Sequence, residues 1–81
     1  MKLSIKTKFN IGDTVYIAEC YEDYWFAYKN PFIVSDILIS ANSRIMHISY
    51  EIQQDNFTHR VPESWAFSTY EECAKWCKKQ N

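Results

Sequence analysis

The sequence predicts a mainly β protein of about five antiparallel strands that ends in one C-terminal helix. Two observations support this prediction. Within residues 8–67, short runs rich in β-branched and aromatic residues alternate with polar turn signals. From Ser68 onward, the spacing of apolar residues changes from two to between three and four. A chain of 81 residues has room for one domain, and we expect residues 1–81 to form it.

Each predicted strand is a run of strand-forming residues bounded by turn residues. The first signal contains the turn pair Gly12-Asp13, and Gly12 can adopt a positive φ at low cost. The strand at residues 44–52 is the clearest, because apolar and polar residues alternate along it. Its apolar face would consist of Met46, Ile48, Tyr50 and Ile52. The predicted strands are residues 9–17, 32–40, 44–52, 57–61 and, as a last short strand, 65–67.

A helix is predicted over residues 69–80. Thr69 and Glu72 fit a capping box, with Ser68 and Glu71 as the alternative register. Acids in the first turn and lysines near the end complement the helix dipole. An apolar stripe at helical spacing should pack onto the sheet, and it consists of Tyr70, Cys73, Ala74 and Cys77.

Charge and composition exclude some classes of function. The formal net charge is −1, and acidic and basic residues are interspersed, which argues against nucleic-acid binding through bulk electrostatics. Local basic groups remain at the two ends, from Lys2, Lys6 and Lys8 and from Lys75, Lys78 and Lys79. Three cysteines, no leader-like apolar run and no stretch of membrane-spanning length predict a cytoplasmic protein with reduced thiols and no membrane association.

Two short motifs carry a resemblance. Phe9-x-Ile11-Gly12-Asp13-x-Val15-Tyr16 resembles the opening of small SH3-like barrels, including KOW-type and Tudor-like domains. Residues 61–73 look like the last strand and C-terminal helix of small proteins from Gram-positive bacteria and their phages. The resemblance implies a small SH3-like, partly open antiparallel barrel of about five strands with the helix packed across it. The long aromatic segment after Ile17 departs from this pattern.

The sequence contains no convincing metal-binding, nucleotide-binding or catalytic motif. Cys73 and Cys77 lie one helical turn apart, but zinc would need two more ligands from Cys20, His47 or His59. We therefore expect the two helical cysteines to be buried, reduced and free of metal. Gly12 is the only glycine, which excludes glycine-rich nucleotide-binding loops. No cofactor and no catalytic residue are predicted, so the chain is expected not to be an enzyme.

The strongest functional signal is the aromatic segment, defined as residues 20–32. Neither alternation nor helical spacing places all of its rings in one small core, and we interpret the surplus as a binding surface. The alternatives are core filling, a cage for a cationic side chain, and stacking of nucleic-acid bases. The negative potential of Glu19, Glu22 and Asp23 favours the cage and disfavours the stacking of bases. The predicted partner-binding residues are Tyr21, Glu22, Asp23, Tyr24, Trp25, Phe26 and Tyr28, with Trp25 as an exposed leading anchor.

These observations predict a non-catalytic protein-binding module. Glu22 and Asp23 favour a partner surface that carries Lys or Arg. By analogy with small phage-encoded proteins, the biological role would be that of an inhibitor or regulator of a host or defence protein. The alternative is a nucleic-acid-binding regulator that uses a KOW-like barrel. The sequence does not predict an oligomeric state.

Overall fold

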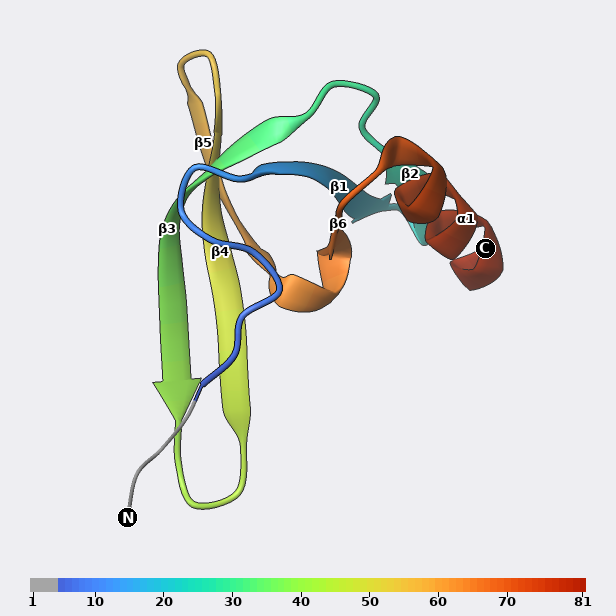
Figure 1. Cartoon of the computed structure of the whole chain (residues 1–81). Helices are drawn as coiled ribbons and strands as arrows, with labels where there is room; N and C mark the ends of the chain where they lie inside the picture. The colour runs from blue at the N-terminus through green and yellow to red at the C-terminus, as the bar shows by residue number, and fades with distance from the viewer. Residues whose placement is uncertain (1–4) are drawn as a thin grey trace.

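The computed structural model of the chain describes residues 5–81, which form a β-rich body with one C-terminal helix (Figure 1). The strands are β1 (Thr14–Tyr21), β2 (Tyr24–Ala27), β3 (Phe32–Ala41), β4 (Met46–Gln54), β5 (Phe57–Pro62) and β6 (Ala66–Phe67). A single 3₁₀ turn, η1 (Glu63–Trp65), separates β5 from β6, and α1 (Tyr70–Gln80) follows β6.

The strands form an antiparallel sheet that curls back on itself. Its order is β2-β1-β3-β4-β5, and β6 also pairs with β1. The chain thereby returns to its first strand through the pairs Tyr16–Phe67 and Ile17–Ala66. Within residues 5–81, β5 pairs only with β4, so one side of the barrel stays open. The predicted small, partly open SH3-like barrel followed by one helix is confirmed.

β1 is buried on both faces. Successive side chains of a strand point to opposite sides, and here both sides are covered. Ile17 points into the barrel core and is 1% exposed, whereas Ala18 points toward α1 and is fully buried. The barrel core consists of Phe9, Val15, Ile17, Phe32, Val34, Tyr50, Ile52, Val61 and Ala66. A second cluster lies outside the barrel, where Ala18 packs against Cys73 and Cys77 of α1.

The segment before β1 is bound to the barrel through Tyr50 and Glu63. Tyr50 is buried, and its hydroxyl donates to Glu63 while accepting from the backbone N–H of Phe9. Glu63 also accepts a hydrogen bond of 2.9 Å from the backbone N–H of Lys8. Of the apolar face predicted for β4, Tyr50 and Ile52 are fully buried and Ile48 is partly buried, whereas Met46 at the far end of the strand is 47% exposed.

The aromatic segment is more regular than the sequence suggested. No strand was predicted between residues 17 and 32, but β1 continues to Tyr21 and β2 begins at Tyr24, which leaves a two-residue turn. Glu22 and Asp23 both have positive φ, of 49° and 65°, as a type I′ hairpin turn requires. The usual Asn-Gly signature is missing from this turn, and for that reason the sequence did not reveal the hairpin.

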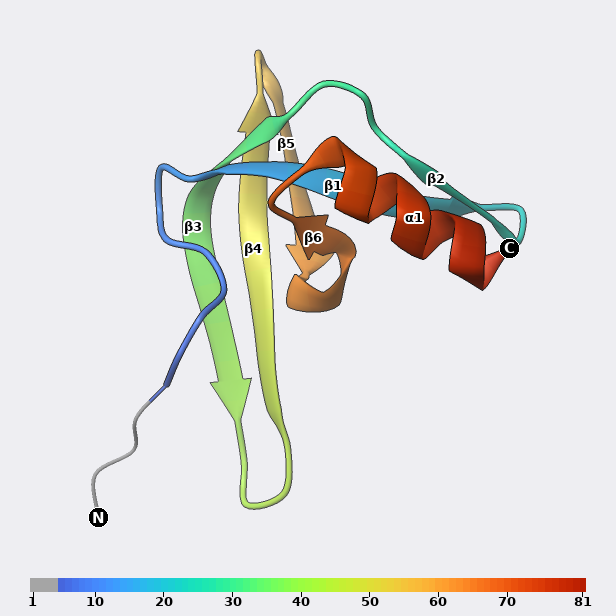
Figure 2. The same ribbon diagram turned by 45° about the vertical axis from the view of Figure 1, so that its right-hand side comes forward.

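α1 begins where the capping box predicted. The Thr69 hydroxyl accepts a hydrogen bond of 3.2 Å from the backbone N–H of Glu72, which confirms this register over the one starting at Ser68. The helix lies beside β1 and β2, outside the barrel, in both views (Figures 1 and 2). No helix within residues 5–81 is long and apolar enough to cross a membrane.

Replacing the capping hydroxyl tests the start of α1. Thr69→Ala should lower the free energy of unfolding by about 1 kcal/mol, because the Glu72 N–H loses its side-chain partner. Urea denaturation followed by circular dichroism measures the change. Ser68→Ala is the matched control and should leave the midpoint in place. Equal midpoints for wild type and Thr69→Ala would contradict this assignment.

Candidate functional site

The β1–β2 hairpin sorts its side chains onto two faces. Because Glu19 pairs with Phe26 and Tyr21 pairs with Tyr24, these four residues share the face that continues from Ile17 of the barrel core. Cys20 and Trp25 form the next pair and point to the opposite side, toward α1. The predicted binding residues therefore do not form one surface.

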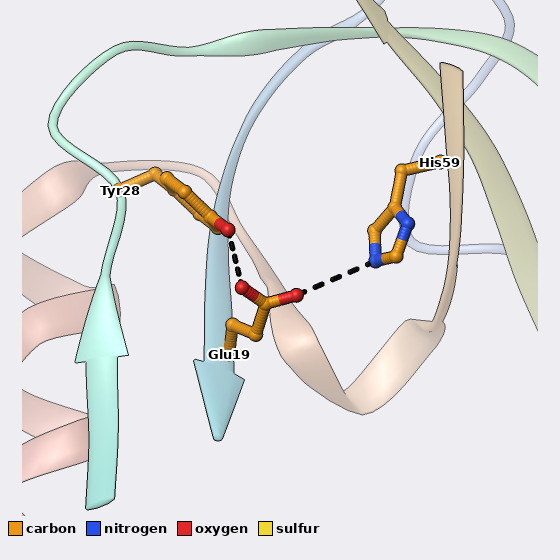
Figure 3. Close-up of polar contacts among 3 residues, drawn as sticks. All are labelled: Glu19, Tyr28 and His59. Carbon is orange, nitrogen blue, oxygen red and sulfur yellow. Dashed lines mark hydrogen bonds and ion pairs between the residues drawn. The ribbon is translucent and has the colours of Figure 1, made fainter. Parts of the chain in front are cut away.

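A second strand contributes to the barrel-side face. On β5, alternation places Phe57 and His59 in phase with Val61, which points into the barrel core. His59 approaches Glu19 of β1 across the open side of the barrel (Figure 3). We define the barrel-mouth surface as Glu19, Tyr21, Tyr24, Phe26, Tyr28, Phe57 and His59. Three of its rings are strongly exposed: Tyr21 at 68%, Tyr24 at 61% and Phe57 at 55%.

Glu19 is the polar centre of the barrel-mouth surface. The Tyr28 hydroxyl donates a hydrogen bond to one oxygen of the Glu19 carboxylate. The other oxygen lies 3.6 Å from Nε2 of His59 (Figure 3). This cluster joins β1, β5 and the residue that follows β2. Neither of the two paired side chains is fully buried, since His59 is 39% exposed and Glu19 is 31% exposed.

A chain of aromatic contacts connects the surface to the core. The Tyr28 ring packs edge-on against Phe26, with centroids 5.2 Å apart, and against Phe32, with centroids 5.5 Å apart. Phe32 belongs to the barrel core. Burial and the hydrogen bond to Glu19 raise the pKa of Tyr28 to about 12, so its hydroxyl remains a donor at neutral pH. Tyr28 is therefore held in place as one wall of the site.

The acids of the hairpin turn lie next to this surface. Glu22 and Asp23 are exposed, and both flanking residues, Tyr21 and Tyr24, are exposed as well. The short turn places these two acidic residues at the end of a regular hairpin. Two acids and two tyrosines thus form the outermost part of the candidate site.

The expectation that Trp25 is an exposed anchor was wrong. Its ring is partly buried and packs edge-on between two other indoles, with centroids 5.1 Å from Trp65 and 4.8 Å from Trp76. The Asn81 amide also pairs with the Trp25 backbone, accepting from its N–H at 2.7 Å and donating to its carbonyl at 2.9 Å. Trp25 thus attaches α1 to β2 and leaves the tyrosines as the exposed rings.

Sequence analysis missed part of the surface. Phe57 and His59 were assigned to a strand but not to the binding site, and Glu19 was considered only as a source of negative potential. Alternation along residues 57–61 does put both side chains in phase with Val61. What alternation alone could not show is that this face of β5 meets Glu19, because that contact spans 40 positions between residues 19 and 59.

A groove of about 380 Å³ runs along the other side of the hairpin, between β2 and α1. Trp25 and Ala27 line one wall, and Tyr70, Ala74 and Lys78 line the other. Asn81 occupies its margin through the two hydrogen bonds to Trp25. The edge of β2 is therefore partly paired by a side chain at the position where another strand could add.

The cysteines fit the expected positions in the core. Cys73 and Cys77 are unpaired by disulfides and are 0% and 4% exposed. Burial, with a smaller contribution from Cys77, raises the pKa of the Cys73 thiol to about 12, and burial also raises the pKa of Cys77. Neither thiol is therefore primed as a thiolate nucleophile. In the described part of the chain, no three His, Cys, Asp or Glu residues are grouped as metal ligands.

Removing the Trp25 ring tests its structural role. We expect Trp25→Ala to lower the free energy of unfolding by about 3 kcal/mol, at the lower end of values for buried aromatic truncations. Tyr24→Ala is the matched control, and its expected cost is below about 1 kcal/mol because only an exposed cross-strand pair is lost. Chemical denaturation of both variants gives the values. Similar losses in the two variants would show that Trp25 does not hold α1 to β2.

Thiol labelling tests the burial of the helical cysteines. With Ellman's reagent, native protein should release one equivalent of chromophore quickly, from the exposed Cys20. The thiols of Cys73 and Cys77 should react only on unfolding. Cys20→Ser should remove the fast phase and leave the slow one. Rapid labelling of all three thiols under native conditions would contradict the packing of α1.

Comparisons of this chain with protein-family models, with curated proteins and with solved structures found no match.

Proposed function

We propose that this chain is a non-catalytic protein-binding module that contacts its partner through the barrel-mouth surface and the adjacent turn acids. The observation that carries the proposal is that Tyr21 and Tyr24 are both exposed and lie side by side at the end of a hairpin with a two-residue turn. Large rings with polar tips are favoured at the centres of protein interfaces. A hairpin fixed by a short turn also loses little conformational entropy on binding.

The charge of this surface indicates the chemistry of the partner. Glu19, Glu22 and Asp23 all belong to the hairpin or its turn. They accompany exposed aromatic faces, which attract cations through their quadrupoles. A partner surface that carries Lys or Arg side chains fits this combination. Binding without chemistry would suit a stoichiometric inhibitor or regulator of a host or defence protein.

The proposal is tested by comparing wild type with a variant that carries Tyr21→Ala and Tyr24→Ala. Proteins captured from the source cell are identified by mass spectrometry, and the chief partner is then purified. The double variant should bind that partner at least about tenfold more weakly, since hot-spot truncations cost more than 1 kcal/mol. Circular dichroism should show it folded. Unchanged affinity in the folded double variant would overturn the proposal.

Reversing the turn charges examines the electrostatic part of the proposal separately. Glu22→Lys with Asp23→Lys should slow association with the purified partner more than it speeds dissociation, because exposed charges act mainly through steering. Surface plasmon resonance at low and high salt measures both rates. The matched control reverses Lys75 and Lys79 to Glu on the helix side. A larger effect from the control would place the contact on the other side of the molecule.

A second candidate function, nucleic-acid binding, has one observation in its favour. Lys75 and Lys79 of α1 line a shallow hollow together with the rings of Phe67 and Trp76. The Lys8 ammonium lies 5.4 Å from the centroid of the Phe67 ring, on the same side of the molecule. Cations beside aromatic rings are the components of single-strand binding surfaces. The Lys75/Lys79 reversal should then abolish binding of a single-stranded oligonucleotide, with affinity falling steeply as salt rises.

A further inference from the structure

Within residues 5–81, Glu19 has acceptor capacity that its neighbours do not use. An ionised carboxylate offers about four lone-pair positions, and the Tyr28 hydroxyl takes one of them. The second oxygen is 3.6 Å from Nε2 of His59, which is within ion-pair distance but beyond hydrogen-bond range. Because the Glu19 side chain is 31% exposed, a ligand could approach it from the solvent.

One basic neighbour, His59, lies close enough to compensate a charge on the Glu19 carboxylate. Among residues 5–81, His59 is the basic side chain that lies within ion-pair distance of the Glu19 carboxylate. When the imidazole is neutral, Glu19 carries a negative charge without a cationic partner. When the imidazole is protonated, a positive charge lies beside the carboxylate. Histidine is the side chain that makes this change between about pH 5 and pH 8.

The two tyrosines near His59 stay uncharged over that range. On β4, the residues that share its face are Tyr50, Ile52 and Gln54, and of these only Tyr50 titrates. Burial raises the pKa of Tyr50 to about 12, and that of Tyr28 is likewise about 12. Glu63 of η1 is engaged by Tyr50. The neighbouring ring on β5, Phe57, stacks on the imidazole at 5.8 Å and carries no charge.

We propose that Glu19 receives a Lys or Arg side chain of the protein partner and that His59, when protonated, competes for the same carboxylate. This inference rests on the proposed function and specifies the chemistry and regulation of the same site. The rings of Phe26, Tyr28 and Phe57 lie on the same surface and provide apolar walls for the alkyl part of such a side chain. Mild acidification then releases the partner.

A pair of small probes tests the receptor role of Glu19. Nα-acetyl-arginine N-methylamide carries the cation, and the corresponding citrulline compound has nearly the same shape without the charge. In NMR titrations near pH 7.5, the arginine probe should shift signals of Glu19, Tyr28 and His59, and the citrulline probe should not. The arginine probe should bind at least about threefold more weakly near pH 5.5 than near pH 7.5, because the imidazolium competes for Glu19.

Two variants separate the receptor from its competitor. Glu19→Gln should abolish the response to the arginine probe at both pH values. His59→Gln should keep the response and lose its pH dependence. Because linkage is reciprocal, the probe should also move the midpoint of the His59 ring titration in wild type to lower pH. This last measurement needs no variant and remains decisive if a substitution disturbs folding.

The inference is overturned if both probes give the same shifts, if neither gives any, or if the affinity of the arginine probe does not change with pH. These results leave the proposed function intact whenever the Tyr21/Tyr24 variant still loses its partner. Conversely, partner binding that survives in the Tyr21/Tyr24 variant refutes the proposed function even if the arginine probe reaches Glu19. The two failures are thus distinguishable.

Discussion

The structure depends on the burial of β1 from both sides while it pairs with three different strands. Its beginning pairs with β3, its middle with β6 and its end with β2. One face fills the barrel through Val15 and Ile17, and the other supports α1 through Ala18. A strand buried on both faces cannot slip by one residue without moving large side chains into small spaces. β1 therefore fixes the register of the hairpin, the closure by β6 and the position of the helix.

This arrangement explains where the surplus of aromatic rings goes. The segment from Tyr21 to Phe32 distributes its rings among three environments, because alternation directs neighbours to opposite sides. Phe32 enters the barrel core, and Trp25 packs with the indoles of Trp65 and Trp76. Only Tyr21 and Tyr24 remain strongly exposed. The aromatic content of the segment is thus largely a structural requirement of a small protein with two cores, and the two exposed tyrosines are the part that packing does not explain.

Local signals in the sequence predicted most of the strands and the helix. Contacts between residues far apart in the chain could not be predicted from it. The Thr69 cap, the buried positions Tyr50 and Ile52 of β4 and the burial of Cys73 each follow from residues that are close together in the sequence. The tight turn at Glu22 and Asp23 was hidden because it lacks the usual Asn-Gly or Asp-Gly pair and because glutamate is not a typical occupant of positive φ. The partial burial of Trp25 and the position of His59 beside Glu19 depend on which distant elements pack around β1, and sequence periodicity does not reveal that packing.

The pairing of β6 with β1 also has a consequence for how the chain folds. β3, β4 and β5 form a meander whose contacts are local, so this part can assemble through short loop closures. The contact between Ile17 and Ala66 must close a loop of about fifty residues, and the helix docks only beyond that point. During synthesis, β1 emerges before the other strands, but β6 and α1, which pack on it, emerge last. Among the strand pairs of β1, the one with β6 therefore carries the largest loop-closure cost.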